Sequence, residues 1–454
     1  MFWGDLLEDM RARIKEITLK MVDLFSERLD LARQIGKLKR ERGLPIKDQS
    51  VEKDLWNSVK ERCIEKRLGE WECRRLFNFL ISSSIRAQVP EGGGAGPHVE
   101  IFRRAKEMEK QGIAVYHLEV GEPPWSFPPE VLDAMIEAIK RGQTRYGTSL
   151  GNERFREAAS NWISKRDSID ASLDQVMPFP GSKYALFSIL SVFLRPGDRL
   201  GIWLPAWPAY KGMASHLSLE VVEISSLEEL ESLKGVSAFI LCSPNNPDGK
   251  VWSKKELEEL SEVLNESNAL LISDDAYAEL SFEDRIPPSK IYENTISVNT
   301  LSKAFGMTGF RVGYVHGKEE YIKRLARFLS LTITSVPEFI QEGAAAALMV
   351  GERFVKDVRM ELESYLGYAL KQLEGGPLEV SKPHGGLYLF PKVLINDFDS
   401  SKFASEVLED KGIAVAPGAG FGPFPDRIRI TYASPYADPG IALLREAIES
   451  WTSS

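Results

Sequence analysis

The segment that decides the fold spans residues 300–311 and reads Thr-Leu-Ser-Lys-Ala-Phe-Gly-Met-Thr-Gly-Phe-Arg. It follows a short apolar run, residues 296–299, which predicts a buried strand. Lys303 therefore stands just beyond a strand end, and glycines allow a turn before Arg311. A lysine beside an arginine in this setting suits an amine that reacts with a carbonyl next to an anion site. Taken alone, such a lysine is usually a solvated surface residue, so the neighbouring segments decide its meaning.

Outward from this segment, short apolar runs alternate with helical patterns. Strands are predicted at 198–204, 237–241, 269–273, 296–299 and 311–315, and helices at 183–194 and 253–265. Strands separated by helices indicate a mostly parallel sheet, which we expect in an α/β large domain over about 141–335. Helical flanks at 99–111 and 352–373 and a mixed C-terminal stretch predict a smaller α+β domain, built from about 99–140 and 336–454.

Polar residues follow several predicted strands, where an open α/β sheet binds its ligands. Residues 243–249 read Ser-Pro-Asn-Asn-Pro-Asp-Gly, and Asp274 ends another strand, where it suits either a helix cap or a salt bridge to a pyridinium nitrogen. Residues 181–183 precede a helix, whose N-terminus can bind phosphate. Arg429 in a late strand and Trp207 complete the set, and Trp207 also fits an ordinary core position.

The first 90 residues have a different composition. They carry a net charge of +4, whereas the whole chain carries −9, so residues 91–454 carry −13. Only six of the 60 glycines and prolines fall there, and a Gly/Pro-rich linker, residues 90–98, separates this N-terminal domain, residues 1–89, from residues 99–454. The net acidity of the chain argues against nucleic acid as a partner.

The N-terminal domain has the pattern of a helical dimer. Apolar residues recur at alternating spacings of three and four from Leu7 to Leu38, and Gly43 and Pro45 end this helix. Further helices are predicted at about 48–67 and 70–88. So long an apolar face exceeds what 90 residues can cover, which favours an intertwined homodimer.

Polar residues interrupt the apolar faces of all three predicted helices. They are Arg11, Arg28, Lys39, Asp48, Glu52, Ser84 and Gln88. One interpretation is a buried salt-bridge network, such as Arg28 with Glu52, that sets the register of the dimer. The other is a pocket for a small dianion, since several cations with two carboxylates and neutral hydrogen-bonding groups exceed what register needs.

Residues 6–88 resemble the all-helical chorismate mutase family. The resemblance rests on Glu27-Arg28, residues 35–39, residues 45–48, Glu52 and residues 84–88. It implies that Arg28, with Arg11 from the partner subunit, holds the two carboxylates of chorismate, and that Ser84 helps to seat one of them. It places Lys39 and Gln88 on the breaking ether oxygen, and Glu52 and Asp48 near the ring hydroxyl. Val51 departs from the family, which often has arginine there.

Residues from about Val99 to the C-terminus resemble the class I aminotransferases of pyridoxal phosphate fold type I, in their aspartate and aromatic branch. The resemblance implies that Lys303 forms the Schiff base with pyridoxal 5′-phosphate and moves the α-proton, while Asp274 keeps the ring nitrogen protonated. It assigns the ring to Trp207, Asn246 and Tyr277, and the phosphate to Ser182, Thr300, Ser302, Arg311 and Tyr146 of the partner subunit. Arg429, with Gly121 and Asn246, would take the substrate α-carboxylate, and Lys183 a distal carboxylate. Asp248 departs from the family, where Thr or Ser is common.

Together these resemblances predict a bifunctional enzyme of aromatic amino acid biosynthesis, a chorismate mutase joined to a transaminase for aspartate or glutamate and a 2-oxo acid. The alternative is a general aspartate aminotransferase with a non-catalytic helical dimerisation or sensing module. Small molecules are the expected partners, and no metal is called for. Three cysteines are too few for a disulfide framework and fit a reducing cytoplasm. Neither a signal peptide nor an apolar run of membrane-spanning length is evident.

Overall fold

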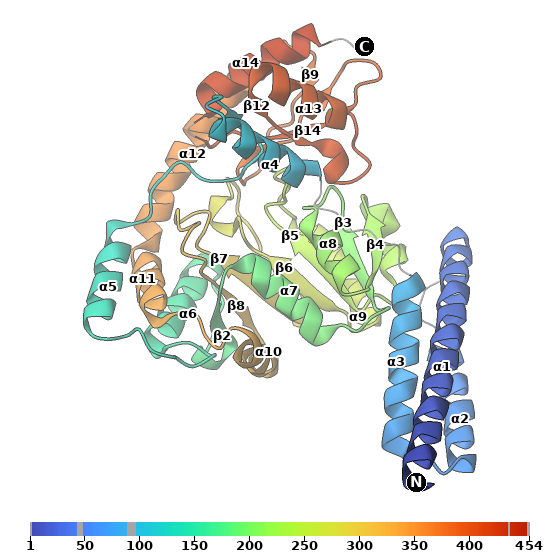
Figure 1. Ribbon diagram of the computed structural model, residues 1–454. Coiled ribbons are helices and arrows are strands. Elements are labelled where there is room, and N and C mark those ends of the chain that lie inside the picture. The colour runs from blue at the N-terminus through green and yellow to red at the C-terminus, as the bar shows by residue number, and fades with distance from the viewer. Residues whose placement is uncertain (1, 43–48, 89–96, 435, 452–454) are drawn as a thin grey trace. The chain divides into compact units, whose positions relative to one another are not determined.

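The computed structural model describes residues 2–42, 49–88, 97–434 and 436–451 (Figure 1). They divide into two compact units. The first holds the helices of the N-terminal domain and also includes Arg195–Arg199 and Ala214–Glu220, and the second holds the rest of the described chain. None of the described helices combines the length and the apolar character needed to cross a lipid bilayer.

The first unit contains the three predicted helices, α1 (Phe2–Glu41), α2 (Gln49–Glu65) and α3 (Glu70–Gln88). Both α1 and α2 pack against α3. Gly36 lets α1 and α3 approach closely, because a Cβ atom at this position would lie 2.7 Å from both Cα and the carbonyl oxygen of Gln88. Gly36 thereby helps to set the position of Gln88, one of the residues predicted to act on chorismate.

A disulfide bond joins Cys63, in the last turn of α2, to Cys73, in the first turn of α3. The low cysteine count argued against a disulfide framework, and this single bond departs from the reduced state that we expected. The spacing of ten residues did not reveal it, because the tight connection between α2 and α3 brings the two Cα atoms to 6.4 Å. Cys242 is buried and free.

The second unit is built on a seven-stranded sheet with the strand order β2-β8-β7-β6-β5-β3-β4. Strands β3, β5, β6 and β7 pair in parallel, as predicted, whereas β8 runs antiparallel to both β2 and β7. The strand bounds are β2 (Val176–Phe179), β3 (Arg199–Trp203), β4 (Glu220–Ile224), β5 (Ala238–Cys242), β6 (Leu270–Asp274), β7 (Thr295–Thr300) and β8 (Gly313–Gly317). Strand β8 begins later than predicted because Arg311 has φ +53°, which no strand accommodates.

Helices cover the sheet and connect its strands. Helix α7 (Ser182–Phe193) packs across β2, β6, β7 and β8, with α10 (Glu319–Thr332) beside it (Figure 1). Helix α6 (Glu153–Asp167) packs on β2, and α11 (Glu338–Met349) packs on α6 and on α5 (Pro129–Lys140). The remaining helices of this part of the chain are α8 (Ala209–His216) and α9 (Lys254–Glu266). Register pairs Cys242 of β5 with Asp274 of β6, so the carboxyl ends of these strands meet at one edge.

The ends of the second unit's sequence come together in a smaller α+β layer. Strand β1 (Tyr116–His117) pairs in parallel with β12 (Ile413–Ala414), and β14 (Ile428–Thr431) lies between β10 (Tyr388–Leu389) and β13 (Ala416–Pro417). Helix α4 (Pro97–Lys110) packs on α13 (Ser400–Lys411), and α14 (Ala437–Ser450) on the long α12 (Gly351–Leu373) (Figure 1). A further short pair is β9 (Leu378–Glu379) with β11 (Lys392–Val393).

The close approach at Gly36 yields a prediction for the helical unit. Gly36→Ala should destabilise this unit by about 1–3 kcal/mol, because the added methyl must displace the backbone of α3. Urea unfolding followed by circular dichroism would measure the change. Gly69→Ala is the control, since its Cβ would meet only the flexible carboxylate of Glu72. Equal stability of Gly36→Ala and the wild type would show that the two helices do not depend on this contact.

Candidate active sites

A cavity of about 380 Å³ lies beside the carboxyl ends of β5, β6 and β7. Its walls also include the segment after β1 and one residue from each of β10 and β14. Of the residues that the sequence predicted for the transaminase site, the lining includes Gly121, Ser182, Lys183, Trp207, Asn246, Asp274, Tyr277, Thr300, Ser302, Lys303, Arg311 and Arg429. The fold thus brings together side chains that lie up to about 300 residues apart in the sequence.

Asp274 forms the buried acidic end of this cavity. Tyr210 Oη donates a hydrogen bond to its Oδ2 at 2.6 Å, and the backbone N–H of Ala276 donates to Oδ1 at 3.3 Å. Burial raises the pKa of Asp274 to about 6, and the nearby carboxylate of Asp275 acts in the same direction. A carboxylate with so high a proton affinity is well suited to hold a protonated ring nitrogen.

An anion cradle is formed by residues around the N-terminus of α7. Gly181 precedes this helix with φ +81°, and a Cβ there would come within 2.6 Å of Arg311 Nη2. The hydroxyls of Thr300 and Ser302 are hydrogen-bonded to each other at 3.0 Å. Backbone N–H groups at a helix start, two hydroxyls and a guanidinium are the donors that a phosphate group requires.

Arg429 is nearly fully buried on the opposite wall. Its Nη1 donates to Asn246 Oδ1 at 3.0 Å, and its Nη2 donates to the carbonyl oxygen of Glu119. Its Nε is buried and makes no hydrogen bond within the described part of the chain. A guanidinium with unused donor capacity inside a cavity is well suited to bind a carboxylate in two places.

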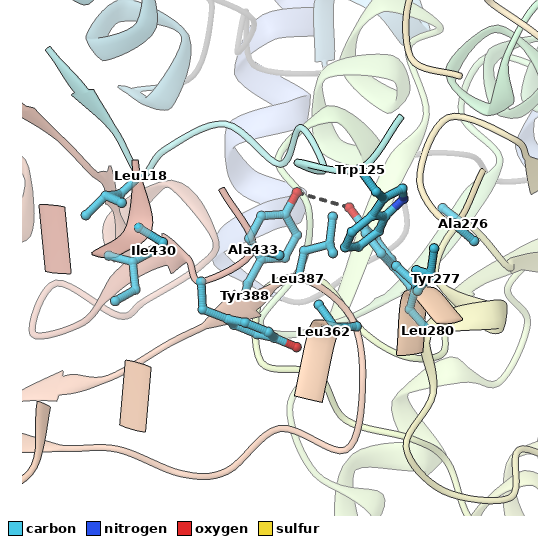
Figure 2. Close-up of a cluster of buried hydrophobic side chains, with 14 of the residues drawn as sticks. Leu118, Trp125, Ala276, Tyr277, Leu280, Leu362, Leu387, Tyr388, Ile430 and Ala433 are labelled. Atoms are coloured by element: carbon cyan, nitrogen blue, oxygen red, sulfur yellow. Dashed lines mark hydrogen bonds between the residues drawn. The ribbon is translucent and has the colours of Figure 1, made fainter. Parts of the chain in front are cut away.

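Tyr388 is a central residue of the cavity that the sequence analysis missed. Its Oη lies 3.1 Å from Tyr277 Oη, and Figure 2 shows the hydrogen bond that joins the two hydroxyl groups. The guanidinium of Arg429 lies 4.2 Å from the centre of the Tyr388 ring. Burial acts to raise the pKa of Tyr388, but the charges of Arg429 and Lys303 hold this pKa below its ordinary value. A Cβ on Gly121 would lie 1.7 Å from Tyr388 Oη, so this phenol occupies the space beside Gly121.

Two lysines face the cavity from different sides. Lys303 Nζ donates to the carbonyl oxygen of Gly121 at 2.5 Å, and its own carbonyl accepts from Trp125 Nε1 at 3.0 Å. Lys183 Nζ lies 4.9 Å from the centre of the Trp207 ring. Burial of the Lys183 amine, with the charges of Arg311 and Lys303 nearby, lowers the pKa of Lys183. This excess of positive charge favours a ligand with several negative charges.

The helical unit has a second cavity, of about 500 Å³. Five predicted residues line it, namely Arg28, Lys39, Glu52, Ser84 and Gln88, among apolar side chains. Gln88 Nε2 donates to the carbonyl of Ser84 at 3.3 Å. Within the described residues, Arg28 Nε is buried without a hydrogen-bond partner, and no ion pair joins Arg28 to Glu52. A salt-bridge network built on that pair is therefore not what this interior contains.

Two predicted residues, Tyr146 and Arg11, line neither cavity. Tyr146 is 91% exposed and does not line the cavity of its own chain, and Arg11 is exposed on α1. Both were expected to act on a partner subunit. Asp48 lies outside the described residues. Asp248 accepts hydrogen bonds from Asn245 Nδ2 at 2.8 Å and Lys250 N at 3.2 Å, so it braces the turn that carries Asn246.

Two functional residues besides Tyr388 escaped the sequence analysis. Tyr210 follows Trp207 by three residues at the start of α8, but only the fold brings it to Asp274. Glu119 has a buried side chain that pairs with His117 at 2.8 Å, and it lines the cavity. The sequence signal for Glu119 was its position two residues before Gly121, which the resemblance had assigned to the substrate carboxylate.

Known families match both units. Residues 114–439 match the family described as aminotransferase class I and II, and residues 10–89 match chorismate mutase type II. The chain is 32% identical to the aspartate aminotransferase of Thermococcus kodakarensis, over 77% of this chain and 92% of that protein. It is 30% identical to the aspartate/prephenate aminotransferase of Thermus thermophilus, over 81% and 97%. The Thermus thermophilus aspartate aminotransferase structure with maleate aligns with TM-score 0.73, covering 78% of this chain and 97% of that one.

The pKa of Asp274 yields a pH prediction. A carboxyl group is neutral below its pKa, so the unloaded protein should lose affinity for pyridoxal phosphate as the pH falls below about 6. Fluorescence titration of cofactor-free protein between pH 5 and 8 would measure this loss. The Asp274→Asn variant should bind pyridoxal phosphate weakly, and its affinity should not show the fall near pH 6 that comes from Asp274. If the variant and the wild type had the same pH dependence of binding, Asp274 would not be the residue that holds the ring nitrogen.

Proposed function

The chain belongs to the class I and II aminotransferases and carries an N-terminal chorismate mutase type II domain, and from this we propose how its two cavities work. The protein is a bifunctional enzyme of aromatic amino acid biosynthesis, an isomerase and a transferase in one chain. The observation that carries the proposal is the convergence of Lys303, Asp274 and Arg429 in one cavity.

Class I aminotransferases depend on pyridoxal phosphate, and the cavity beside the sheet fits this cofactor. Asp274 would hold the ring nitrogen, Trp207 would cover the ring, and Tyr277 and Asn246 would bind the ring oxygen. The anion cradle of Gly181, Ser182, Thr300, Ser302 and Arg311 would bind the phosphate, since its hydroxyls and guanidinium line one cavity and the lack of a Cβ on Gly181 lets Arg311 approach the start of α7. When bound, the cofactor supplies the electron sink that makes the α-proton of an amino acid removable.

The remaining steps belong to side chains of the protein. Lys303, once its amine leaves Gly121 O, would take the proton from the α-carbon of the amino acid. It would then deliver this proton to the carbon atom of the cofactor that carried the aldehyde. Arg429 would orient the amino acid through its α-carboxylate, with Nε and the Nη groups as donors. Tyr388, hydrogen-bonded to Tyr277 and packed on Arg429, would set the orientation of both groups.

The second cavity would rearrange chorismate without a covalent intermediate. Arg28 would hold one carboxylate, and Lys39 and Gln88 would stabilise the negative charge that develops on the ether oxygen as its bond breaks. Apolar residues of α1 and α3 would force the substrate into the compact conformer that reacts, which lowers the entropic part of the barrier. Glu52 and Ser84 would accept or donate hydrogen bonds at the ring hydroxyl and a carboxylate.

We propose that two copies of the chain complete both sites. Nine apolar residues of α1 are between 47% and 66% exposed, and they follow the spacing of a helix face: Leu7, Met10, Ile14, Ile17, Met21, Leu24, Leu31, Ile35 and Leu38. A second copy would cover this face and supply Arg11 to the chorismate cavity. The exposed ring of Tyr146 would similarly reach the phosphate of a partner's cofactor.

The donor that fits best is aspartate or glutamate, and the acceptor is prephenate or an arylpyruvate. With Arg311 assigned to the phosphate and Arg429 to the α-carboxylate, Lys183 gives the cavity a further positive charge, which favours a substrate with a second carboxylate. A relative with 30% identity is named for both aspartate and prephenate. A purely structural helical module is disfavoured, because its interior presents five polar residues to a cavity instead of an apolar seam.

The full-length protein should convert chorismate and aspartate, with pyridoxal phosphate, into an aminated product identifiable by mass spectrometry. Lys303→Ala should abolish transamination and leave chorismate consumption intact, because the two cavities are built from separate residues. Arg28→Ala should slow chorismate consumption by about 100-fold or more and leave transamination intact, since it leaves a substrate carboxylate unpaired.

Each variant is thus the control of the other. Retained turnover in Lys303→Ala would overturn the transaminase assignment. Wild-type chorismate consumption in Arg28→Ala would return the helical unit to a structural role.

A further inference from the structure

A cluster of buried charges lies behind the residues that would hold the cofactor. Arg166 donates to Asp167 and Glu279, each at 2.5 Å, and to Asn299 Oδ1 at 2.8 Å. Arg285 donates to Asp275, and to Asp167 at 3.2 Å. All five charged side chains are at most 8% exposed, so these contacts form in an environment of low dielectric.

Apart from those to Asp167 in α6, the contacts of the cluster end on segments that carry a cofactor residue. Arg285 Nε donates at 2.9 Å to the carbonyl of Ser243, three residues before Asn246. Asp275 directly follows Asp274, and its Oδ1 also accepts from Ser273 Oγ at 2.6 Å. Glu279 follows Tyr277 by two residues in the 3-10 helix Ala278–Leu280, and Asn299 precedes Thr300 on β7. Two arginines thus tie together the ends of three strands.

The cluster also carries charge. Two guanidinium groups face three carboxylates, and burial lowers the pKa of the adjacent His316 to about 4, so this imidazole is neutral at pH 7. Arg359 approaches from α12 and donates only to the backbone carbonyl of Glu279, and Tyr314 lies on the sheet side. Asp275 Oδ2 is buried and makes no hydrogen bond within the described residues. Because Arg359 adds a third guanidinium, the charges of the cluster nearly balance, and it is the carboxylate of Asp275, next to Asp274 in the chain, that adds to burial in raising the pKa of Asp274.

We propose that Asp275, held by Arg285 and Ser273, is a positioning residue for the cofactor ring. It fixes the turn that aims Asp274 and Tyr277 into the cavity, and its charge keeps the surroundings of Asp274 negative, which favours a protonated ring nitrogen. The proposal thus has an electrostatic half, the charge of Asp275, and a geometric half, the position of the turn. Arg285 serves the geometric half, because it joins this turn to the segment that carries Asn246. The inference rests on the proposed cofactor site and extends it to residues outside the cavity.

The two halves predict different results. Asp275→Asn keeps the shape of the side chain and can still accept from Ser273, but it removes the charge. Without that charge Asp274 should bind protons less tightly, so the pH midpoint of pyridoxal phosphate binding should fall by about one unit. Arg285→Lys keeps the charge and loses the fork that reaches Ser243, so it should weaken binding about tenfold without moving the midpoint.

The test compares two ligands on cofactor-free full-length protein, namely pyridoxal phosphate and its carbocyclic analogue with C–H in place of the ring nitrogen. Asp275→Asn should weaken binding of pyridoxal phosphate at pH 8 at least about fivefold and leave the analogue unchanged. Arg285→Lys should weaken both equally. Asp284→Asn is the matched control, because this neighbouring carboxylate is exposed, and it should match the wild type.

Near-ultraviolet circular dichroism and thermal unfolding of the full-length protein report that the second unit, which carries all three substitutions, is folded in each variant. Equal weakening of both ligands in Asp275→Asn, with an unmoved midpoint, would reduce Asp275 to a structural residue and overturn the electrostatic half. Wild-type binding in both variants would overturn the whole inference. Wild-type protein that binds no pyridoxal phosphate would instead overturn the proposed function, so the two failures are distinguishable.

Discussion

Parallel pairing of β5, β6 and β7 is the constraint on which the cavity beside the sheet depends. Because these strands run in one direction and in a common register, their carboxyl ends meet at a single edge. Asn246, Asp274 and Lys303 each follow a different strand, yet they face one space of about 380 Å³. Main-chain hydrogen bonds of the sheet hold this edge rigid, which suits a site that must orient a flat ring.

Charge decides what this edge can bind. The cavity gathers Lys183, Lys303, Arg311 and Arg429 against few carboxylates, and Arg429 Nε has no hydrogen-bond partner among the described groups. Burying such cations together costs free energy unless bound anions pair with them. A phosphate at one end and a substrate carboxylate at the other would balance this positive charge. Between them, the buried carboxylate of Asp274 would pair with the protonated ring nitrogen.

The helical unit also gathers polar side chains into one cavity, but close packing of helices brings them together instead of strand pairing. Close contact at Gly36 brings α1 against α3, and the polar residues that interrupt the apolar faces then line one cavity. Its remaining apolar face on α1 stays exposed within one chain. Hydrophobic burial would therefore drive a second copy onto this face, so the assembly and the completion of the site would share one cause.

Local sequence patterns determined the helices of the first unit and the parallel strands of the second, and the motifs that resemble known families named most of the predicted cavity residues. Period-two and period-3.6 patterns act over a few residues, and a lysine or glycine at a strand end has a local meaning that can be read directly. The disulfide between Cys63 and Cys73, the start of β8 at Gly313, and the places of Tyr210, Glu119 and Tyr388 were decided only by tertiary structure. The physical reason is that each of these depends on the distance between segments or on a backbone angle set by packing, as when Tyr388 fills the space beside Gly121 from a strand more than 260 residues away.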